Sequence, residues 1–500
     1  MTVHIGNFVR YHAALRPQHV AVVSEADSLT YAQLERRASG CARALAALGV
    51  LPADRVVFAL NNGLEWLLLY QGILRAGAVP VPLNPLLAGP ELAAIIQDCA
   101  PRLVLARPDL LPGLAASGIT AQDALAPALT AIEAEPAPLP VASADSVALM
   151  LYSSGSTGRP KGIQLTHGNI FWNAQAFAFD LLRLTPEDRG YGVLPFSHVF
   201  GHTCLMSAFL YAGATLYLAP RFDAAEALAT IARERITIFM GVPTMYWTMA
   251  DAPLPEAADI SAWRACVSGG QALPEDVHRR FESRFNVLIS EGYGMTELSP
   301  SVTGNRFFGA RRKPGSAGQP YLGVRVRILD DQGQDVPAGA LGEIVVSGPG
   351  VAKGYFNQPE LTAQTFRDGW LYSGDIGRLD EDGFLYVVDR KKEMIITGGY
   401  NVYPREVEEL LYSQPGILEA AAIGVPDERL GERIVAFLVP SQQGAAPAPE
   451  AVLTALEGQL ARYKLPRAVH VLDALPRNAT GKVDRIRLRA IGREIFGQKA

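Results

Sequence analysis

Apolar and polar positions along the N-terminal part of the chain follow the periods of helices and strands. Thr30 and Gln33 can form a capping box at the start of an amphipathic helix predicted over 30–48, and Gly49 can end it. Beyond it, the pattern predicts a strand, a helix and a strand in turn, at 56–60, 64–75 and 79–83. This alternation is typical of a parallel α/β sheet.

Three further units in the middle of the chain each consist of an apolar strand and a loop of small residues. The strands are predicted at 236–240, 265–268 and 287–290, and the loops that follow them at 241–244, 269–271 and 291–297. Open α/β sheets bind ligands beyond the carboxyl ends of their strands. These loops are therefore candidates for the walls of a ligand site.

The pattern changes near residue 323 to short strands between Asp-Gly and Gln-Gly turns, which predicts a small antiparallel sheet or barrel with strands at 324–329, 342–347 and 384–388. After the polar break at 389–393, a compact α+β unit is predicted, with helices at 404–412 and 450–463 and strands at 418–424, 434–439 and 469–472. We therefore expect an α/β protein with a large N-terminal domain, residues 1–388, and a smaller α+β domain, residues 389–500. The larger domain should combine doubly wound sheets with the small barrel.

The composition agrees with a well-packed globular protein. Of 500 residues, 49% are hydrophobic and 19% charged, and the net charge is −5, so nucleic acid is not expected as a partner. Residues 1–16 lack a signal-peptide pattern, and no apolar run reaches membrane-spanning length. The cysteines are far apart, without a CxxC pair, which is typical of reduced thiols in a cytoplasmic protein: Cys41, Cys99, Cys204 and Cys266.

The stretch from Tyr152 to Gly162 carries the most specific chemistry in the chain. It follows a predicted buried strand at 147–151 and is polar, small and rich in glycine. Glycines let backbone N–H groups point into one concavity, hydroxyls add donors and Lys161 adds positive charge, which together suit a polyphosphate. The Gly-Lys-Ser/Thr ending of a Walker A loop is missing. A plain serine–glycine surface loop would not need Pro160 and Lys161 to stiffen and charge its exit. The expected phosphate ligands are Ser153, Ser154, Gly155, Ser156, Thr157, Gly158 and Lys161.

The apolar segment 193–202 contains His198 and His202 and suits the wall of a ligand pocket. Taken alone, either histidine is more often a structural hydrogen-bonding residue. Neither is expected to bind a metal, because no cluster of carboxylates or cysteines lies near them in the sequence.

Five motifs, in this order along the chain, resemble those of the adenylate-forming superfamily, which includes acyl-CoA and aryl-CoA synthetases, peptide-synthetase adenylation domains and beetle luciferases. They are Tyr152–Gly162, Tyr293–Glu297, Tyr372–Asp375, Asp389–Pro404 and Pro476–Lys482. The resemblance covers essentially the whole chain. It implies that a carboxylic acid reacts with ATP to give an acyl-adenylate and pyrophosphate, and that the acyl group then passes to the thiol of coenzyme A. The implied cofactors are ATP, Mg²⁺ and coenzyme A.

The resemblance also implies roles for individual residues. Tyr293 stacks on adenine, Thr296 contacts phosphate and Glu297 binds Mg²⁺, a hard cation that prefers oxygen ligands. Asp375 accepts the ribose hydroxyls, with Arg390 beside it. The ammonium of Lys482 bridges the substrate carboxylate and the α-phosphate. The remaining expected nucleotide contacts are Gly270, Gln271, Glu291, Gly292 and Gly294.

The same resemblance implies that the C-terminal domain rotates about Asp389 between the two half-reactions. After the rotation, Gly398, Gly399 and Tyr400 guide the thiol to the acyl-adenylate. Lys464 and Arg467, which flank Leu465-Pro466, are candidate contacts for the phosphates of coenzyme A, although a solvated face is the simpler interpretation.

The acyl pocket is expected to hold a monocarboxylic acid with an aliphatic or aromatic tail. Adenylation domains for α-amino acids place an aspartate where this chain has Ser197, so an ammonium would lack its counter-ion. The pocket stretches contain no lysine or arginine, which argues against a dicarboxylate. The expected lining is His198, Val199, Gly201, Met240, Gly241, Ser268, Gly269, Gly294 and Met295, with His198 as the gate near the carboxylate.

Other functions remain open at this point. A phosphopantetheine arm on a carrier protein has the same thiol as coenzyme A and could be the acceptor. A luciferase-like oxygenase is less well supported, because nothing in the sequence indicates oxygen chemistry. A non-catalytic adenylate-binding protein would be favoured if Lys482, Glu297 or the phosphate loop were degraded, and all three are intact.

Overall fold

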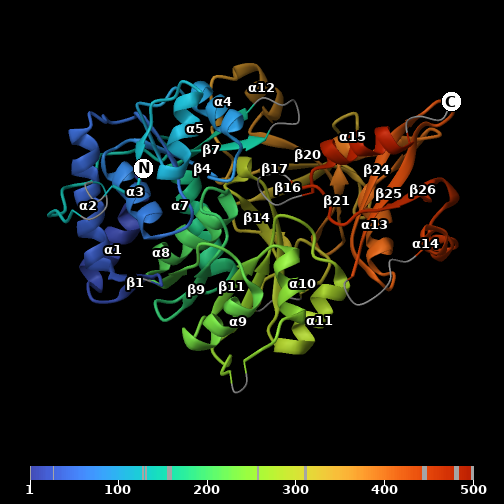
Figure 1. Cartoon of the computed structure of the whole chain (residues 1–500), viewed down its shortest axis with the longest axis horizontal. Coiled ribbons are helices and arrows are strands. Elements are labelled where there is room, and N and C mark those ends of the chain that lie inside the picture. The colour runs from blue at the N-terminus through green and yellow to red at the C-terminus, as the bar shows by residue number, and fades with distance from the viewer. Residues whose placement is uncertain are drawn as a thin grey trace. The chain divides into compact units, whose positions relative to one another are not determined.

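The computed structural model describes residues 2–25, 27–126, 129, 132–154, 160–255, 258–308, 312–441, 448–477 and 483–496. The chain divides into a larger unit, residues 1–326 with 346–371, and a smaller unit, residues 327–345 with 372–500. Figure 1 labels their elements. Among the described residues, no helix is both long and apolar enough to cross a membrane.

The first sheet of the larger unit has four parallel strands in the order β4-β3-β5-β6, which confirms the predicted strand–helix–strand pattern. Both bonds of the capping box predicted at the start of α2 are present: Gln33 N donates to Thr30 Oγ1 at 3.3 Å and Thr30 N to Gln33 Oε1 at 2.8 Å. The bounds are α1 (Asn7–Leu15), α2 (Tyr31–Ala47), β3 (Arg55–Ala59), α3 (Leu64–Arg75), β4 (Val79–Leu83), α4 (Gly89–Cys99), β5 (Leu103–Ala106), η1 (Pro108–Leu110), α5 (Leu111–Ala116) and β6 (Gln122–Asp123).

The second sheet has nine strands in the order β15-β14-β13-β12-β11-β9-β10-β1-β2. The six neighbouring strands β13, β12, β11, β9, β10 and β1 run parallel. The ends of β11 and β12 and the middle of β13 are level, because Gly241 pairs with Ser268 and Ser268 pairs with Glu291. The bounds are β1 (Val20–Val23), β2 (Ser28–Thr30), β9 (Arg189–Gly192), β10 (Thr215–Leu218), β11 (Ile238–Gly241), β12 (Ala265–Ser268), β13 (Ile289–Gly294), β14 (Ser301–Gly304) and β15 (Gln319–Pro320).

Helices α9, α10 and α11 pack on one face of this sheet (Figure 1). The buried rings of Phe239, Tyr246, Trp263 and Phe281 form the centre of that core. The bounds are α9 (Ala224–Arg233), α10 (Pro243–Asp251), α11 (Glu275–Phe285), η4 (Thr296–Leu298) and α12 (Pro359–Thr365).

A third sheet, in the order β18-β8-β7, is an antiparallel hairpin with one added strand. Helix α7 follows it and continues as a π-helix, and a second π-helix precedes α8. The bounds are β7 (Val147–Ser154), β8 (Pro160–Thr166), α7 (His167–Gln175), η2 (Ala176–Leu181), η3 (Phe200–Ser207), α8 (Ala208–Ala212), β18 (Gly354–Tyr355) and β19 (Phe366–Arg367).

In the smaller unit, β20 pairs antiparallel with β21, and a separate five-stranded sheet has the order β23-β22-β25-β24 with β26 beside β25. The helix predicted over 450–463 is wrong at its C-terminal end: α14 stops at Leu456, because Gly458 adopts a left-handed conformation with φ 83°. The bounds are β20 (Trp370–Leu379), β21 (Leu385–Arg390), η5 (Lys391–Glu393), β22 (Ile395–Thr397), β23 (Tyr400–Val402), α13 (Pro404–Tyr412), β24 (Ile417–Asp427), β25 (Gly431–Pro440), α14 (Pro449–Leu456), η6 (Arg462–Lys464), β26 (Ala468–Val471) and α15 (Arg485–Phe496). Strands β16 (Arg325–Leu329) and β17 (Gly342–Ser347) lie at the positions predicted for them.

Candidate active site

The predicted phosphate loop closes the β7–β8 hairpin. Ser153 pairs with Lys161 across the hairpin, and Ser154 with Pro160. The positions predicted between them as phosphate ligands lie outside the described residues: Gly155, Ser156, Thr157 and Gly158. The hairpin therefore presents Ser153 and the cation of Lys161 at the two ends of the loop.

Tyr355 connects the two charged residues expected around the phosphates. Its hydroxyl donates a hydrogen bond to Glu297 Oε1 at 2.9 Å, and the Lys161 ammonium lies 5.5 Å from the centre of its ring. Both Tyr355 and Glu297 are buried. Burial, together with the neighbouring Glu297 carboxylate, raises the pKa of Tyr355, so its hydroxyl remains a donor.

Tyr355 could not be predicted as a site residue from the sequence, because it lies in a strand of two residues, which is too short to show a helix or strand period. Pairing of β18 with β8 places Tyr355 opposite Ile163, and thus beside the β7–β8 hairpin that carries the predicted phosphate loop. The backbone at Ala352 also donates to the carbonyl of Glu297, at 2.8 Å. Residues 352–355 therefore hold Glu297 from two sides.

The predicted adenine motif, Tyr293–Glu297, begins on β13, where Gly292 and Gly294 are required by the close approach of the backbone at Pro300 and Thr303. A Cβ at Gly294 would lie 2.1 Å from the carbonyl oxygen of Pro300, and one at Gly292 would lie 2.6 Å from that of Thr303. Tyr293 between them is buried, and its N–H donates to Thr303 Oγ1 at 3.1 Å. The glycines thus have a structural reason in addition to the predicted nucleotide contact.

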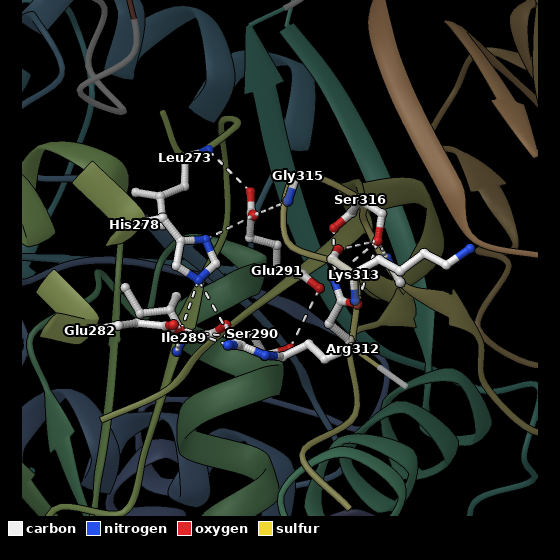
Figure 2. Close-up of polar contacts among 12 residues, drawn as sticks. Leu273, His278, Glu282, Ile289, Ser290, Glu291, Arg312, Lys313, Gly315 and Ser316 are labelled. Atoms are coloured by element: carbon white, nitrogen blue, oxygen red, sulfur yellow. Dashed lines mark hydrogen bonds and ion pairs between the residues drawn. The ribbon is translucent and has the colours of Figure 1, made fainter. Parts of the chain in front are cut away.

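Glu291 was predicted as a nucleotide contact, and its carboxylate accepts hydrogen bonds from the protein backbone (Figure 2). Oε2 accepts from Leu273 N at 3.2 Å and Oε1 from Gly315 N at 3.3 Å. The carboxylate therefore ties the loop after β12, which includes Gly270 and Gln271, to the start of the adenine motif.

The predicted acyl residues from three separate stretches come together at the level ends of β11 and β12. Gly269 N donates to Gly241 O at 3.2 Å. A Cβ at Gly269 would lie 3.0 Å from the ring of Phe200, so the segment that contains His198, Val199 and Gly201 lies against this edge. Met240 and Ser268 are buried in the strands themselves, and Met295 is half-buried beyond β13.

Asn62, which sequence analysis missed, fixes the segment before His198. Its Oδ1 accepts from Phe196 N at 2.9 Å, and its Nδ2 donates to Leu194 O at 2.8 Å and to Gly192 O at 3.1 Å. The position of Asn62 just after a predicted strand was a signal that could have found it, because polar residues at strand ends often support ligand sites.

The two histidines of this segment have different environments. His198 is half-buried, and its Nδ1 accepts from Phe200 N at 3.3 Å. His202 is fully buried, and its ring lies edge-on to Tyr70 with centroids 4.8 Å apart. Burial lowers the pKa of His202 to about 3, so its imidazole is neutral. This environment agrees with a structural role for His202, the simpler interpretation of either histidine.

Within the smaller unit, the two predicted ribose contacts are neighbours. Asp375 and Arg390 are paired across β20 and β21, with Arg390 Nε 3.4 Å from Asp375 Oδ1. The adjacent Asp389, predicted as the hinge, accepts from Arg405 N at 3.0 Å. Lys482, the predicted catalytic cation, lies outside the described residues.

The predicted coenzyme A residues share one region of the smaller unit. Gly398 and Gly399 form the turn between β22 and β23 with φ of 57° and 83°, which favours glycine. Tyr400 stacks on Tyr463 with centroids 4.3 Å apart, and both rings are exposed. Lys464 Nζ donates to the Glu406 carboxylate at 2.6 and 2.8 Å, so it would have to leave Glu406 to reach a phosphate. Arg467 is anchored through its backbone, which donates to Ile434 O at 2.8 Å.

In the described part of the chain, no group of three or more His, Cys, Asp or Glu side chains could hold a metal ion. The single carboxylate of Glu297 fits an ion that is coordinated mainly by phosphate oxygens, as Mg²⁺ is at nucleotide sites. The buried Tyr355–Glu297 pair therefore suits Mg²⁺ that arrives with a nucleotide.

The chain is similar to known proteins over nearly its whole length. Residues 9–356 match the AMP-binding enzyme family, and residues 406–482 match the AMP-binding enzyme C-terminal domain. The chain is 40% identical over 484 residues to a feruloyl-CoA synthase of Amycolatopsis sp, covering 96% of this chain and 97% of that protein. It is 39% identical over 503 residues to an indoleacetate–CoA ligase of Aromatoleum aromaticum, covering 96% of both. Its structure is similar to ATP-bound MatB from Rhodopseudomonas palustris, with a TM-score of 0.92, 36% identity and coverage of 99% of this chain and 100% of that one.

Proposed function

The chain belongs to the AMP-binding enzyme family, and on that premise we propose that it activates an aromatic monocarboxylic acid for transfer to coenzyme A. The reaction type is that of an AMP-forming acyl-CoA synthetase, which uses ATP, Mg²⁺ and coenzyme A. The aromatic nature of the acid and the role of each residue are our proposal.

A carboxylate is a poor acylating agent, since its leaving group would be oxide. Attack of the carboxylate on the α-phosphate of ATP breaks the bond to pyrophosphate, which leaves, and gives an acyl-adenylate whose leaving group is AMP. Bound Mg²⁺ would supply positive charge next to the phosphate oxygens. The protein's task is to position the reactants and to stabilise the negative charge that builds up on these oxygens. Ser153 and Lys161 would hold phosphate oxygens, and Glu297, oriented by Tyr355, would hold the ion. The observation that carries this proposal is the arrangement of Lys161, Tyr355 and Glu297 beside the hairpin loop.

An aromatic acid is supported by the side chains behind the predicted acyl wall. Trp66, Tyr70, Phe196 and His202 form a fully buried cluster, with the Trp66 and Phe196 centroids 5.3 Å apart. These rings have almost no accessible surface and so support the wall from behind. The ring of Phe200 lies at the edge itself, 3.0 Å from the position of a Cβ at Gly269, and a flat ring there would offer offset or edge contacts to an aryl group. The names of the feruloyl and indoleacetate relatives support the same class of acid.

The test is a panel of acids assayed for ATP–pyrophosphate exchange and, with coenzyme A added, for thioester formation. The panel contains ferulate, indoleacetate, octanoate and palmitate. We expect kcat/KM for one of the aryl acids to exceed that for either alkanoate by roughly tenfold or more, the scale of a few apolar contacts.

Preference for an alkanoate would overturn the aromatic assignment while leaving the reaction type intact. Exchange without thioester would point to a carrier-protein phosphopantetheine as the acceptor in place of coenzyme A. Absence of exchange with every acid would overturn the adenylation proposal itself.

A further inference from the structure

A cluster of four charged side chains, two of them buried and two partly buried, lies beside β13 (Figure 2). His278 and Glu282 are four residues apart on α11, Glu291 lies on β13, and Arg312 comes from the segment that follows β14. His278 is 4% exposed and Glu291 is 9% exposed. Burial of charge is costly unless the charges are paired, so the pairing within this cluster decides its protonation.

Glu282 is held by strong contacts that do not involve the nucleotide loops. Arg312 donates to both of its carboxylate oxygens, at 2.6 and 3.0 Å, and Ile289 N donates to Oε1 at 2.7 Å. Arg312 also donates to Ile289 O at 2.6 Å. The Arg312–Glu282 pair therefore fixes the start of β13 against α11.

Glu291 is the member of the cluster that reaches the nucleotide loops. Its carboxylate accepts from Leu273 N and Gly315 N at 3.2 and 3.3 Å, distances at the long end of the range for hydrogen bonds. Its carbonyl accepts from Asn305 N at 3.0 Å. Glu291 thus connects three segments of the chain: the loop that contains Gly270 and Gln271, the start of the predicted adenine motif, and the segment around Gly315.

His278 lies between the two carboxylates. Its Nε2 is 2.9 Å from Glu282 Oε1, and its Nδ1 is 3.6 Å from Glu291 Oε1. An imidazolium can direct an N–H toward each carboxylate. A neutral ring would turn a lone pair toward one of them, which is repulsive. Arg312 Nη1 lies 3.3 Å from Nε2, and both side chains contact the same Glu282 carboxylate.

We propose that His278, as an imidazolium, holds the Glu291 carboxylate in the orientation that ties the Gly270–Gln271 loop to the adenine motif, and so acts as a positioning residue for ATP binding. This inference rests on the proposed function, because it requires that these two loops hold ATP. His278 itself contacts the carboxylates of Glu282 and Glu291, each of which also accepts a hydrogen bond from a backbone N–H.

The electrostatics of the cluster support this protonation state. Burial lowers the pKa of His278, but the interactions with Glu282 and Glu291 outweigh burial and raise the pKa to about 9. Burial raises the pKa of Glu282, but His278 and Arg312 outweigh it and bring the pKa down to about 2. At neutral pH His278 is therefore an imidazolium and the carboxyl group of Glu282 is ionised.

The test is calorimetric titration of the full-length protein with Mg²⁺ and α,β-methylene-ATP, a non-hydrolysable analogue. At pH 7, His278→Gln should raise the Kd for the analogue by roughly tenfold, the low end of what a supporting contact contributes to a bound site. The ratio of variant Kd to wild-type Kd should fall toward one as the pH rises from 8 to 10, because the wild type then loses the imidazolium. Other titrating groups are common to both proteins and cancel in the ratio.

His12→Gln is the matched control. His12 is also a buried helical histidine, with Nε2 2.9 Å from Tyr211 O, and it lies on α1 away from the nucleotide motifs in sequence and in hydrogen bonding. Its Kd for the analogue should match the wild type. If His278 served only to stabilise the fold, His278→Gln would behave like His12→Gln. Each variant would then have a lower melting temperature and a Kd equal to that of the wild type.

The proposal is overturned if His278→Gln binds the analogue within twofold of the wild type at pH 7, or if the Kd ratio does not change with pH. Should His278→Gln not fold, Glu291→Gln takes its place, and the same rise in Kd is expected. A wild-type Kd that is equal at pH 7 and pH 10 would then overturn the proposal. If the wild type neither binds the analogue nor exchanges pyrophosphate, the proposed function itself has failed, which is a separate result.

Discussion

Removal of the Tyr355 hydroxyl should change the Mg²⁺ dependence of adenylation more than it changes the stability of the fold. In Tyr355→Phe the ring remains, and with it the contact to the Lys161 ammonium at 5.5 Å from the ring centre. The hydrogen bond to Glu297 Oε1 at 2.9 Å is lost. The substitution therefore separates the orientation of the carboxylate from the packing of the ring.

The size of the effect follows from the burial of both partners. Glu297 and Tyr355 are each 7% exposed, so water cannot readily replace the lost donor. A hydrogen bond to a charged group contributes about 1.5–3 kcal/mol. Since about 1.4 kcal/mol corresponds to tenfold in an equilibrium constant, the Mg²⁺ concentration for half-maximal adenylation should rise by roughly tenfold to a hundredfold.

The assay is ATP–pyrophosphate exchange at saturating ATP and acid, with Mg²⁺ varied. Tyr31→Phe is the matched control, because its buried hydroxyl donates to Ala214 O at 2.8 Å and contacts no predicted site residue. It should lose comparable stability, measured by urea unfolding, with no change in Mg²⁺ dependence. If Tyr355→Phe has the Mg²⁺ dependence of the wild type, Tyr355 does not orient a metal ligand and the reasoning is refuted.

Three further predictions address the other charged groups. Lys482→Ala should reduce pyrophosphate exchange by at least about a hundredfold, as loss of a charge-stabilising group does, and leave the Kd for coenzyme A unchanged by calorimetry; normal first-step rates would exclude a bridging role. Asp389→Pro should retain exchange and stop thioester formation, and equal loss of both activities in a rate assay would contradict the hinge hypothesis. His278 has a pKa raised from 6.5 to about 9, so its stabilisation is complete below pH 6.5 and is lost as the pH rises to about 9. In urea unfolding, the difference in free energy of unfolding between the wild type and His278→Gln should therefore fall over that pH range, by at most on the order of 3 kcal/mol. A difference that is independent of pH would contradict the assignment of the imidazolium.

Much of the fold could be predicted from local patterns. The helix 64–75 and the strands 79–83, 265–268 and 342–347 begin and end at the predicted residues, because apolar periodicity over one element is a local property. The helix predicted to reach residue 463 failed at Gly458, where a left-handed backbone ends the element early. Composition indicated buried thiols, and all four cysteines are free and buried.

Part of the candidate site could also be predicted, wherever a motif lies at the end of a strand. The parallel register of β11, β12 and β13 brings the predicted loops to one edge, as expected. Asp375 and Arg390 were predicted separately and are cross-strand neighbours. The roles of these residues toward ATP, the acid and coenzyme A remain predictions.

The sequence by itself determined the order of the elements, the family to which the chain belongs and the type of reaction, because motifs and hydrophobic periods are short-range properties of the chain. Only the tertiary structure decided that Tyr355 joins Lys161 to Glu297 and that His278 lies between Glu282 and Glu291. Those contacts depend on strand pairing and on helix packing between residues far apart in the sequence. Their side chains carry no local pattern, since a buried charge or hydroxyl becomes meaningful only when its partner is known.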